Sequence, residues 1–297
     1  MATVPPIDDW RTLLDLALAE DIGSGDLTSA LVIDADREGR ARIEARESMV
    51  VCGLPVLQEV FARVDPDLII ELDPKISDGT HVDAGSVLMR VHGRYASILT
   101  AERTALNFLG RLCGISTQTR TLVDRVTDRN VDLVDTRKTT PGWRVLEKYA
   151  VAVGGGVNHR VGLYDAVLVK DNHIAAAGGL DQAVERAVSK APPGVDVQIE
   201  VESEQMADRA IELGANFLLL DNLDPDTIGR IVSRHGKDVL LEASGGIGPE
   251  NLRAYAETGI ARISMGALTH SVRSTDVALE VDLLPTAEAD RTERGGA

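Results

Sequence analysis

The feature that most constrains the fold is a regular alternation of short apolar runs and helical segments in the second half of the chain. The apolar runs are 131–134, 166–169, 195–201, 217–220, 239–241 and 261–265. Strands that alternate with helices in this way predict a parallel β-sheet covered by helices. Six strands, with one more possible, favour an α/β barrel over a doubly wound sheet. No GxGxxG fingerprint follows the first strand, which lowers a dinucleotide-binding interpretation.

Helix boundaries in this half of the chain have clear signals. Asp224 and Pro225 form a cap and a first-turn proline, and Gly236 follows the end of the same helix. Pro249 and Gly259 bracket the next helix. These residues are favoured at such positions, so the segments between the strands are predicted to be helical.

The first half of the chain has a different pattern. Apolar spacing over 10–17 predicts an amphipathic helix, and the polar, glycine-bearing segment 20–28 predicts a loop. Between 41 and 95 the apolar residues alternate with period two, which predicts a small sheet with a helix near 54–64. A long helix is expected from about residue 97 to 126. We therefore expect a smaller α/β domain before the barrel.

Composition limits the partners that the chain can have. Its net charge is −16, its pI is about 4.8 and only 3% of its residues are aromatic. Such a chain repels phosphate backbones and anionic membranes, and it has few residues on which bases can stack, so we expect no nucleic acid and no membrane partner. Cys52 and Cys113 form no CxxC pair, which indicates reduced thiols in a cytoplasmic protein. A bound anion requires a local basic pocket.

Polar clusters follow each predicted strand of the second half. In barrels and in doubly wound sheets alike, the active site lies at the carboxyl ends of the strands. Six polar clusters at these ends are difficult to explain as solvated loops alone. The residues at these positions are Asp135, Thr136, Arg137, Lys138, Thr139, Thr140, Lys170, Asp171, Asn172, His173, Glu200, Glu202, Asp221, Asn222, Glu242, Ser244, Gly245, Gly246, Met265, Gly266 and Ala267.

The residue types in these clusters suit anionic substrates. Arginine and lysine, here Arg137, Lys138, Arg160 and Lys170, match carboxylates and phosphates. Acidic strand ends supply the hard oxygen ligands that hold Mg²⁺ together with substrate phosphates. Small residues before the last two helices allow backbone N–H groups to approach a phosphate. The clusters predict a phosphorylated sugar beside a second anionic substrate, with a divalent ion between them. No HExxH spacing supports a zinc site.

Several stretches resemble quinolinate phosphoribosyltransferase, the carboxylating nicotinate-nucleotide pyrophosphorylase family. They are 20–28 (EDIGSGDLT), 100–117 (TAERTALNFLGRLCGIST), 135–144 (DTRKTTPGWR), 154–174 (GGGVNHRVGLYDAVLVKDNHI), 199–202 (IEVE), 219–223 (LLDNL) and 242–247 (EASGGI). The resemblance extends from about residue 10 to 282. It implies an N-terminal α/β sandwich, over 1–115 and the chain end at about 272–297, and an incomplete seven-stranded α/β barrel over 116–271.

The resemblance also implies an activity. The enzyme, a pentosyltransferase, would transfer phosphoribose from phosphoribosyl pyrophosphate to quinolinate, with Mg²⁺ as the cofactor. The products would be nicotinate mononucleotide, pyrophosphate and CO₂, on the de novo route to NAD. The family works at least as a homodimer with shared active sites.

By the same resemblance, individual residues receive roles. The carboxylates of quinolinate would be held by Thr136, Arg137, His159, Arg160 and Lys170, with Arg103 arriving from the neighbouring subunit. Phosphoribosyl pyrophosphate would be bound by Lys138, Glu200, Asp221, Ser244, Gly245, Gly246, Met265, Gly266, Ala267 and His270. The catalytic set would be Lys138, Lys170, Glu200 and Asp221, of which Glu200 and Asp221 would also hold the Mg²⁺.

Three alternatives remain beside this interpretation. A related phosphoribosyltransferase could use another acceptor, such as nicotinate, although the set Arg103, Arg137, Arg160 and Lys170 favours a dicarboxylate. A non-catalytic phosphosugar-binding barrel would bind phosphoribosyl pyrophosphate without releasing pyrophosphate. The segment 78–91 has some likeness to a lipoyl- or biotinyl-carrier pattern, but it has no lysine at a hairpin tip, so we interpret it as scaffold.

Overall fold

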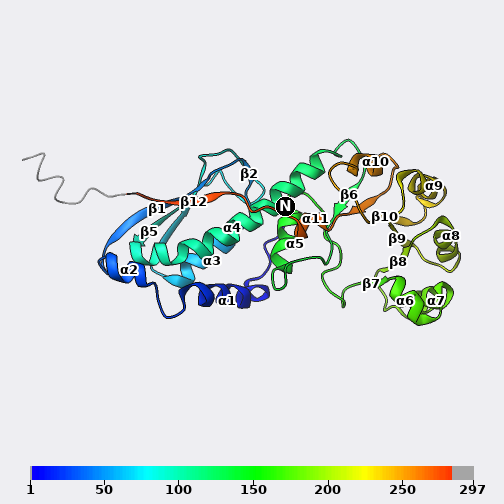
Figure 1. Ribbon diagram of the computed structural model, residues 1–297, viewed down its shortest axis with the longest axis horizontal. Coiled ribbons are helices and arrows are strands. Elements are labelled where there is room, and N and C mark those ends of the chain that lie inside the picture. Colours follow the sequence, from blue (N-terminus) through cyan, green and yellow to red (C-terminus); the bar gives the residue numbers. More distant parts are fainter. Residues whose placement is uncertain (1, 283–297) are drawn as a thin grey trace, which may run out of the picture. The chain divides into compact units, whose positions relative to one another are not determined.

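The computed structural model describes residues 2–282. It divides into two compact units (Figure 1). Among the described residues, the first unit contains 2–117 and 273–282, and the second contains 118–272. Within the described residues, no helix is long and apolar enough to span a membrane.

The first unit is built on an antiparallel four-stranded sheet with the order β12-β1-β5-β3. Its strands are β1 Glu38–Ala45, β3 Ile69–Leu72, β5 Val87–Arg94 and β12 Val277–Asp282. Burial alternates along β1, as expected for a sheet with one covered face. Because β12 pairs with β1 along six residues, Arg40 to Ala45, the chain end completes this sheet.

Four helices accompany this sheet: α1 Arg11–Ile22, α2 Leu27–Val32, α3 Leu54–Val64 and α4 Tyr95–Asp124, whose last turns belong to the second unit. A short 3-10 turn, η1 Ile7–Asp9, precedes them, and β2 Met49–Val50 pairs with β4 His81–Val82. The expected helix at 54–64 is confirmed residue for residue, and the long helix begins at Tyr95. The core contains fully buried side chains from both layers, among them Ile43, Met89, Leu57 and Phe61.

The loop expected over 20–28 is shorter in the structure, so that prediction was wrong at both ends. Helix α1 continues to Ile22, and only four residues separate it from Leu27. Gly23 ends the first helix with a φ of 52°, where a side chain is disfavoured. Asp26 then caps α2, because its carboxylate accepts the backbone N–H of Ser29 at 3.0 Å.

The second unit is an α/β fold with a parallel six-stranded sheet in the order β6-β11-β10-β9-β8-β7. Its strands are β6 Asp132–Val134, β7 Val167–Val169, β8 Val197–Val201, β9 Phe217–Asp221, β10 Leu240–Ser244 and β11 Arg262–Ser264. All six predicted strands are confirmed. Strands β8 and β9 are almost continuously buried, as in sheets whose two faces are both covered.

A seventh parallel segment is reduced to one residue. Val157 forms an isolated parallel bridge with Val134, and its N–H donates to the Leu133 carbonyl at 2.8 Å. It follows the glycine run 154–156, in which Gly155 has a φ of 95°, so the chain cannot stay extended long enough to form a strand there. The sheet therefore runs from this bridge through β6 to β7.

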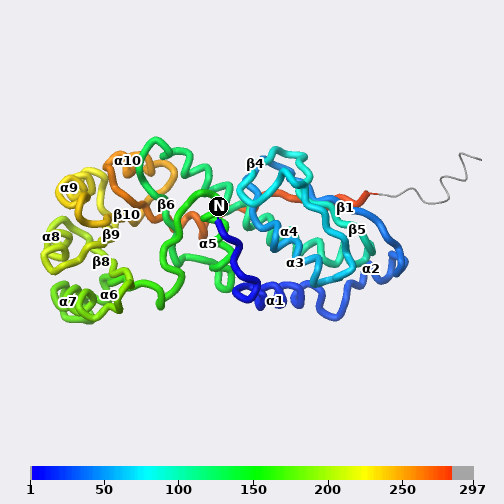
Figure 2. Tube along the Cα trace, turned by 180° about the vertical axis from the view of Figure 1, so that it is seen from behind, coloured from blue at the N-terminus to red at the C-terminus, as the bar shows by residue number. Residues whose placement is uncertain are grey.

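Helices connect the strands and lie along their outer side (Figures 1 and 2). They are α5 Arg144–Val153, α6 Asp171–Ala177, α7 Leu180–Lys190, α8 Glu204–Glu212, α9 Pro225–His235, α10 Leu252–Ala256 and α11 Ala267–His270. The predicted limits of α9 are confirmed. Asp224 caps it by accepting the Thr227 N–H at 2.9 Å, and Gly236 follows its last residue.

Candidate functional site

A cavity of about 600 Å³ lies at the carboxyl ends of the parallel strands in the second unit. Strands at neighbouring positions end at the same edge, so side chains far apart in the sequence meet there. The lining residues are Thr136, Arg137, Lys138, His159, Arg160, Leu168, Lys170, Asp171, Glu200, Leu219, Asp221, Asn222, Glu242, Ser244, Gly245, Gly246 and Ser264. Most of the candidate site residues from the sequence are therefore brought together in one place.

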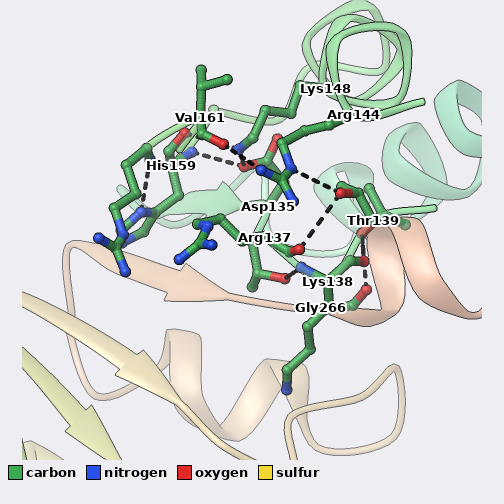
Figure 3. Close-up of polar contacts among 12 residues, drawn as sticks. Asp135, Arg137, Lys138, Thr139, Arg144, Lys148, His159, Val161 and Gly266 are labelled. Atoms are coloured by element: carbon green, nitrogen blue, oxygen red, sulfur yellow. Dashed lines mark hydrogen bonds and ion pairs between the residues drawn. The ribbon is translucent and has the colours of Figure 1, made fainter. Parts of the chain in front are cut away.

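The end of β6 is fixed by a buried ion pair (Figure 3). Asp135 is fully buried, and its carboxylate accepts from Lys148 Nζ at 2.5 Å and from the His159 backbone N–H at 2.8 Å. Burial raises the pKa of Asp135 to about 6, against the opposing effect of the Lys148 ammonium. The same loss of solvation lowers the pKa of Lys148.

The hydrogen bonds of His159 define its tautomer. Its Nδ1 accepts the backbone N–H of Arg160 at 2.7 Å, so the ring proton of a neutral imidazole lies on Nε2. Nε2 then donates to Gln198 Oε1 at 2.8 Å and lies 3.5 Å from the buried carboxylate of Glu242. Burial lowers the pKa of His159, although Glu242 opposes this shift, which favours the neutral ring. Glu242 is also 3.1 Å from Arg262 Nε.

Two guanidinium groups in the cavity have no carboxylate partner among residues 2–282. Arg137 Nε is buried without a hydrogen bond, and the Arg137 side chain extends toward His159 (Figure 3). Arg160 donates to the Ala166 carbonyl at 3.2 Å. Burial lowers the pKa of Arg160, and the neighbouring Arg137 charge adds to that effect. Two close cations that form no ion pair within residues 2–282, with the charge of Asp165 a minor influence on Arg160, make this part of the cavity suited to an anionic ligand.

Carboxylates occupy the neighbouring part of the cavity. Lys170 Nζ donates to Glu200 Oε2 at 2.6 Å, and the Glu200 side chain is only 7% exposed. The pKa of Asp221 is raised by burial and by the charge of Glu200, and the charges of Lys170 and Lys138 oppose that shift. The two carboxylates stand on the neighbouring strands β8 and β9 and line the same cavity.

The end of β10 turns tightly beside this acidic pair. Asn222 has a φ of 55°, and its N–H donates to the Ser244 carbonyl at 2.9 Å. Gly245 has a φ of 91°, and a Cβ there would lie 2.2 Å from Asn222 Oδ1. A Cβ on Gly246 would meet no atom within 4 Å, so its backbone faces open space. This turn can present its backbone to a ligand at close range.

The residues after β11 lie near the cavity but do not line it. Met265 is buried, and a Cβ on Gly266 would come within 2.9 Å of the His270 ring and 3.0 Å of Lys138 Cδ. Lys138 and His270 thus converge over Gly266, and Ala267 begins α11. Thr269 anchors this corner by donating to the Lys138 carbonyl at 2.7 Å.

Arg103 lies elsewhere in the chain, on α4 of the first unit. Its side chain is 63% exposed, and within the described chain its ion pair is with the adjacent Glu102 at 3.9 Å. The cavity described above is built from second-unit residues alone.

Some site residues were missed by reasoning from the sequence. Gln198 precedes Glu200 by two positions in β8, and residues with this spacing share a face of a strand, so it could have been found. Lys148 had no such signal, because only the packing of α5 against the end of β6 brings it to Asp135. The sequence analysis also missed three residues that line the cavity but lie outside the polar clusters: Leu168, Leu219 and Ser264.

Two family models match the chain almost end to end. The N-terminal domain of quinolinate phosphoribosyl transferase matches residues 26–113, and its C-terminal domain matches residues 115–280. The chain belongs to the quinolinate phosphoribosyltransferase family. The second match contains every residue that lines the cavity.

Curated relatives and solved structures agree with this family. A probable nicotinate-nucleotide pyrophosphorylase (carboxylating) of Bacillus subtilis is 41% identical over 92% of this chain and 93% of its own. The solved nicotinate-nucleotide pyrophosphorylase of Francisella tularensis is 39% identical, with a TM-score of 0.89 over 94% of this chain and 98% of its own. NadC from Streptococcus pyogenes has a TM-score of 0.90 at 35% identity, over 95% and 100% of the two chains.

Proposed function

We propose that this protein is a quinolinate phosphoribosyltransferase that takes part in NAD biosynthesis. It transfers phosphoribose from phosphoribosyl pyrophosphate to quinolinate and releases pyrophosphate and CO₂, giving nicotinate mononucleotide. The observation that carries the proposal is the pair of cavity guanidinium groups, Arg137 and Arg160, that have no carboxylate partner within residues 2–282. Family membership and relatives with this activity in their names support it.

The basic part of the cavity is assigned to quinolinate. Arg137, Arg160 and Lys170 supply charge for its two carboxylates, and Thr136 and neutral His159 supply polar contacts. A dicarboxylate neutralises both unpaired guanidinium groups, whereas nicotinate leaves one half-buried cation without a partner. Because an unpaired charge that is partly removed from water is costly, this pocket discriminates against nicotinate.

The opposite part of the cavity is assigned to phosphoribosyl pyrophosphate. Lys138 meets the pyrophosphate, and the open backbone at Gly246 is suited to the 5′-phosphate. The supporting residues at this end are Ser244, Gly245, Met265, Gly266, Ala267 and His270. Glu200 and Asp221 lie between the two parts and face the ribose.

The residues present fit Mg²⁺ as a cofactor, provided that the substrate supplies further ligands. Within the described residues, no cluster of three or more His, Cys, Asp or Glu side chains could hold a metal ion. Glu200 and Asp221 nevertheless offer two neighbouring carboxylates in the cavity. Mg²⁺ is commonly held by one or two carboxylates together with substrate phosphates. When bound, the ion supplies charge stabilisation for the departing pyrophosphate.

The chain's own residues act by holding the reactants in place. Arg137 and Arg160 fix the carboxylates and so direct the ring nitrogen toward the anomeric carbon of the ribose. As pyrophosphate departs, that carbon gains positive charge, and the carboxylates of Glu200 and Asp221 stabilise it. After the C–N bond forms, the cationic ring accepts the electron pair of the C–CO₂ bond, CO₂ leaves, and the ring carbon takes a proton. A dry pocket favours loss of the carboxylate.

We also propose that the protein works as a homodimer or a larger homo-oligomer in which Arg103 enters the cavity of a neighbouring copy. The exposure of Arg103 and its weak pairing with Glu102 support this. Mixing Arg103→Ala chains with Lys170→Ala chains tests it. Each variant alone is expected to be inactive, and mixed oligomers are expected to regain activity, since one of their sites keeps both residues. Mixed oligomers without activity would contradict shared sites.

The decisive experiment is a reaction with defined substrates. The purified protein is incubated with quinolinate, phosphoribosyl pyrophosphate and Mg²⁺, and nicotinate mononucleotide and CO₂ are measured, with nicotinate as a parallel acceptor. Product is expected from quinolinate alone and is expected to disappear when a chelator removes the metal. Product from nicotinate would instead support the alternative in which the enzyme uses another acceptor. Tight binding of phosphoribosyl pyrophosphate without release of pyrophosphate would support a non-catalytic barrel.

A further inference from the structure

The buried ion pair of Asp135 and Lys148 lies directly behind the basic part of the cavity. Neither side chain is exposed by more than 3%. Neither side chain is therefore accessible to a ligand, and neither Asp135 nor Lys148 is among the residues that line the cavity. Yet both hold the segment Asn158–His159–Arg160, which carries two of the residues assigned to quinolinate (Figure 3).

The two side chains of the pair form hydrogen bonds to the backbone on both sides of His159. Lys148 Nζ donates to the His159 carbonyl at 2.9 Å, and Asp135 accepts the His159 N–H at 2.8 Å. With its side-chain amide oriented to donate, Asn158 also reaches the second carboxylate oxygen of Asp135 at 3.0 Å. The backbone on either side of the His159 Cα is thus fixed by charged groups, which are the stronger class of hydrogen-bond partners.

The position of Arg160 depends on these hydrogen bonds to the His159 backbone. Once the His159 backbone is fixed, its ring accepts the Arg160 N–H at 2.7 Å and donates to Gln198 at 2.8 Å. The Arg160 guanidinium then donates to the Ala166 carbonyl at 3.2 Å, beside Arg137. Holding two like charges close together requires a rigid backbone, because each guanidinium repels the other in the free cavity.

A buried ion pair is a poor device for stability alone. Removing two charges from water costs more than their attraction returns in many proteins, and apolar replacements of similar volume are often neutral for stability. The pKa shifts of Asp135 and Lys148 are both in the direction that burial imposes. The location of this pair behind the cavity, with hydrogen bonds to the His159 backbone, indicates a role in positioning that backbone.

We propose that Asp135 and Lys148 are positioning residues that hold His159 and Arg160 in the arrangement that recognises the two carboxylates of quinolinate. The proposal rests on the proposed function and deepens it by naming residues that set acceptor affinity without touching the acceptor. Since no hydrogen bond or ion pair joins Lys138 or Gly246 to this pair within residues 2–282, binding of phosphoribosyl pyrophosphate is expected to be independent of it.

Two variants test this role. Lys148→Met combined with Asp135→Asn replaces both charges by neutral side chains of similar size, so that no lone charge is left buried. Asn158→Ala leaves the ion pair intact and removes two side-chain hydrogen bonds, to Asp135 Oδ2 and to the Lys148 carbonyl, so it remains informative if the double variant does not fold. Asp65→Asn serves as the matched control, because Asp65 is a buried carboxylate of the first unit that accepts from Arg94 and Ser97.

The readouts are the KM values for both substrates, kcat, and quinolinate binding by calorimetry. The double variant is expected to raise the KM and the Kd for quinolinate at least tenfold and to leave the KM for phosphoribosyl pyrophosphate within twofold. Asn158→Ala is expected to raise the quinolinate values about threefold. Asp65→Asn is expected to lower the melting temperature without changing the ratio of the two KM values.

Three results would overturn the proposal. The first is a folded double variant with a wild-type KM for quinolinate. The second is an equal rise in both KM values, which indicates a general loosening of the site. The third is an unchanged quinolinate affinity in Asn158→Ala. Failure of the proposed function is distinct from these results, because it appears as a wild-type protein that forms no nicotinate mononucleotide.

Discussion

The two units treat buried and half-buried charge in opposite ways. In the first unit, several charged side chains on the antiparallel sheet form ion pairs. Arg42 bonds with Glu44 on its own strand, β1, and with Asp282 on the neighbouring β12, and the buried Asp65 accepts from Arg94 at 2.8 Å and from Ser97 at 2.6 Å. These carboxylates have their cationic partners within the described residues of the same unit.

In the second unit, charges that meet at the strand ends remain unbalanced. Arg137 and Arg160 are neighbouring cations that form no ion pair in the described part of the chain, and Glu200 and Asp221 interact as like charges. A protein tolerates such an arrangement where a ligand supplies the missing charges. The difference between the units therefore indicates which one binds anions, independently of any family likeness.

The largest expected effect comes from removing an unpaired cation. Arg137→Ala is expected to lower kcat/KM for quinolinate roughly a hundredfold to a thousandfold, because truncating one partner of a buried charge pair costs about 2–5 kcal/mol. The paired Arg42 of the first unit gives the contrast, and Arg42→Ala is expected to leave kcat/KM within about twofold. Steady-state kinetics check both. Similar losses in the two variants would remove the distinction between the units.

The acidic pair predicts the next largest effect. Asp221→Asn is expected to lower kcat roughly a hundredfold, since a charge aimed at the developing positive centre is lost, and to raise the Mg²⁺ concentration needed for half-maximal rate. Glu47→Gln is the first-unit control, because Glu47 is paired with Arg273 and accepts the Asp276 N–H at 2.8 Å. Rates are measured over a Mg²⁺ titration. An unchanged titration curve for Asp221→Asn would argue against its role at the metal.

Alanine substitutions at two glycines with nearly the same φ distinguish the effect of backbone strain from the effect of a steric clash. Gly79 in the first unit has a φ of 95° with open space around it, whereas Gly245 has a φ of 91° and a Cβ added there would lie 2.2 Å from Asn222 Oδ1. Gly79→Ala is expected to cost about 1 kcal/mol of unfolding free energy from strain alone. Gly245→Ala is expected to cost more and to raise the KM for phosphoribosyl pyrophosphate about tenfold. Equal costs with an unchanged KM would show that the turn plays no part in binding.

The smallest effect is a pH dependence of a few fold. The pKa of Asp135 is raised to about 6 by burial, against Lys148, the His159 N–H and Arg262, whereas at Asp65 burial is outweighed by hydrogen bonds from Ser97 and Arg94, which lower its pKa. Asp135 therefore favours folding most when protonated, and this contribution is lost as the pH rises through about 6. The contribution of Asp65 has the opposite sign and is lost as the pH falls.

For activity, protonation of Asp135 weakens its hold on Lys148. The KM for quinolinate is expected to rise a few fold as the pH falls below about 6, while the KM for phosphoribosyl pyrophosphate changes less. The comparison protein is the double variant Asp135→Asn with Lys148→Met, which lacks this ionisation. Because both proteins meet the same substrate ionisation, the difference between their profiles isolates the pair. Parallel profiles would exclude Asp135 as the titrating group.

Local patterns allowed most of the second unit to be predicted. Apolar runs located all six parallel strands, and the cap at Asp224 located α9. The polar clusters that follow those runs then meet in one cavity, because parallel strands end at a common edge. The roles assigned to the individual residues stay predictions until the variants are measured.

The errors came from places where local signals compete. Segment 20–28 has the composition of a loop, but α1 and α2 extend into it from both sides. The seventh strand of the expected barrel is a single bridge at Val157. Glycines precede this residue, and after it the His159 N–H donates to the Asp135 carboxylate and, within residues 2–282, to no neighbouring strand. Propensity does not register such tertiary competition.

By itself, the sequence determined the alternation of strands and helices, the location of the polar clusters and the family. The first two follow from periodicity and from residue chemistry, which are local properties of the chain, and the family follows from the resemblance of its motifs. Only the tertiary structure decided that Lys148 meets Asp135, that His159 carries its proton on Nε2, and that Arg137 lacks a carboxylate partner in the described chain. The physical reason is that pairing and burial of charge depend on what lies nearby in space, and sequence spacing does not fix that.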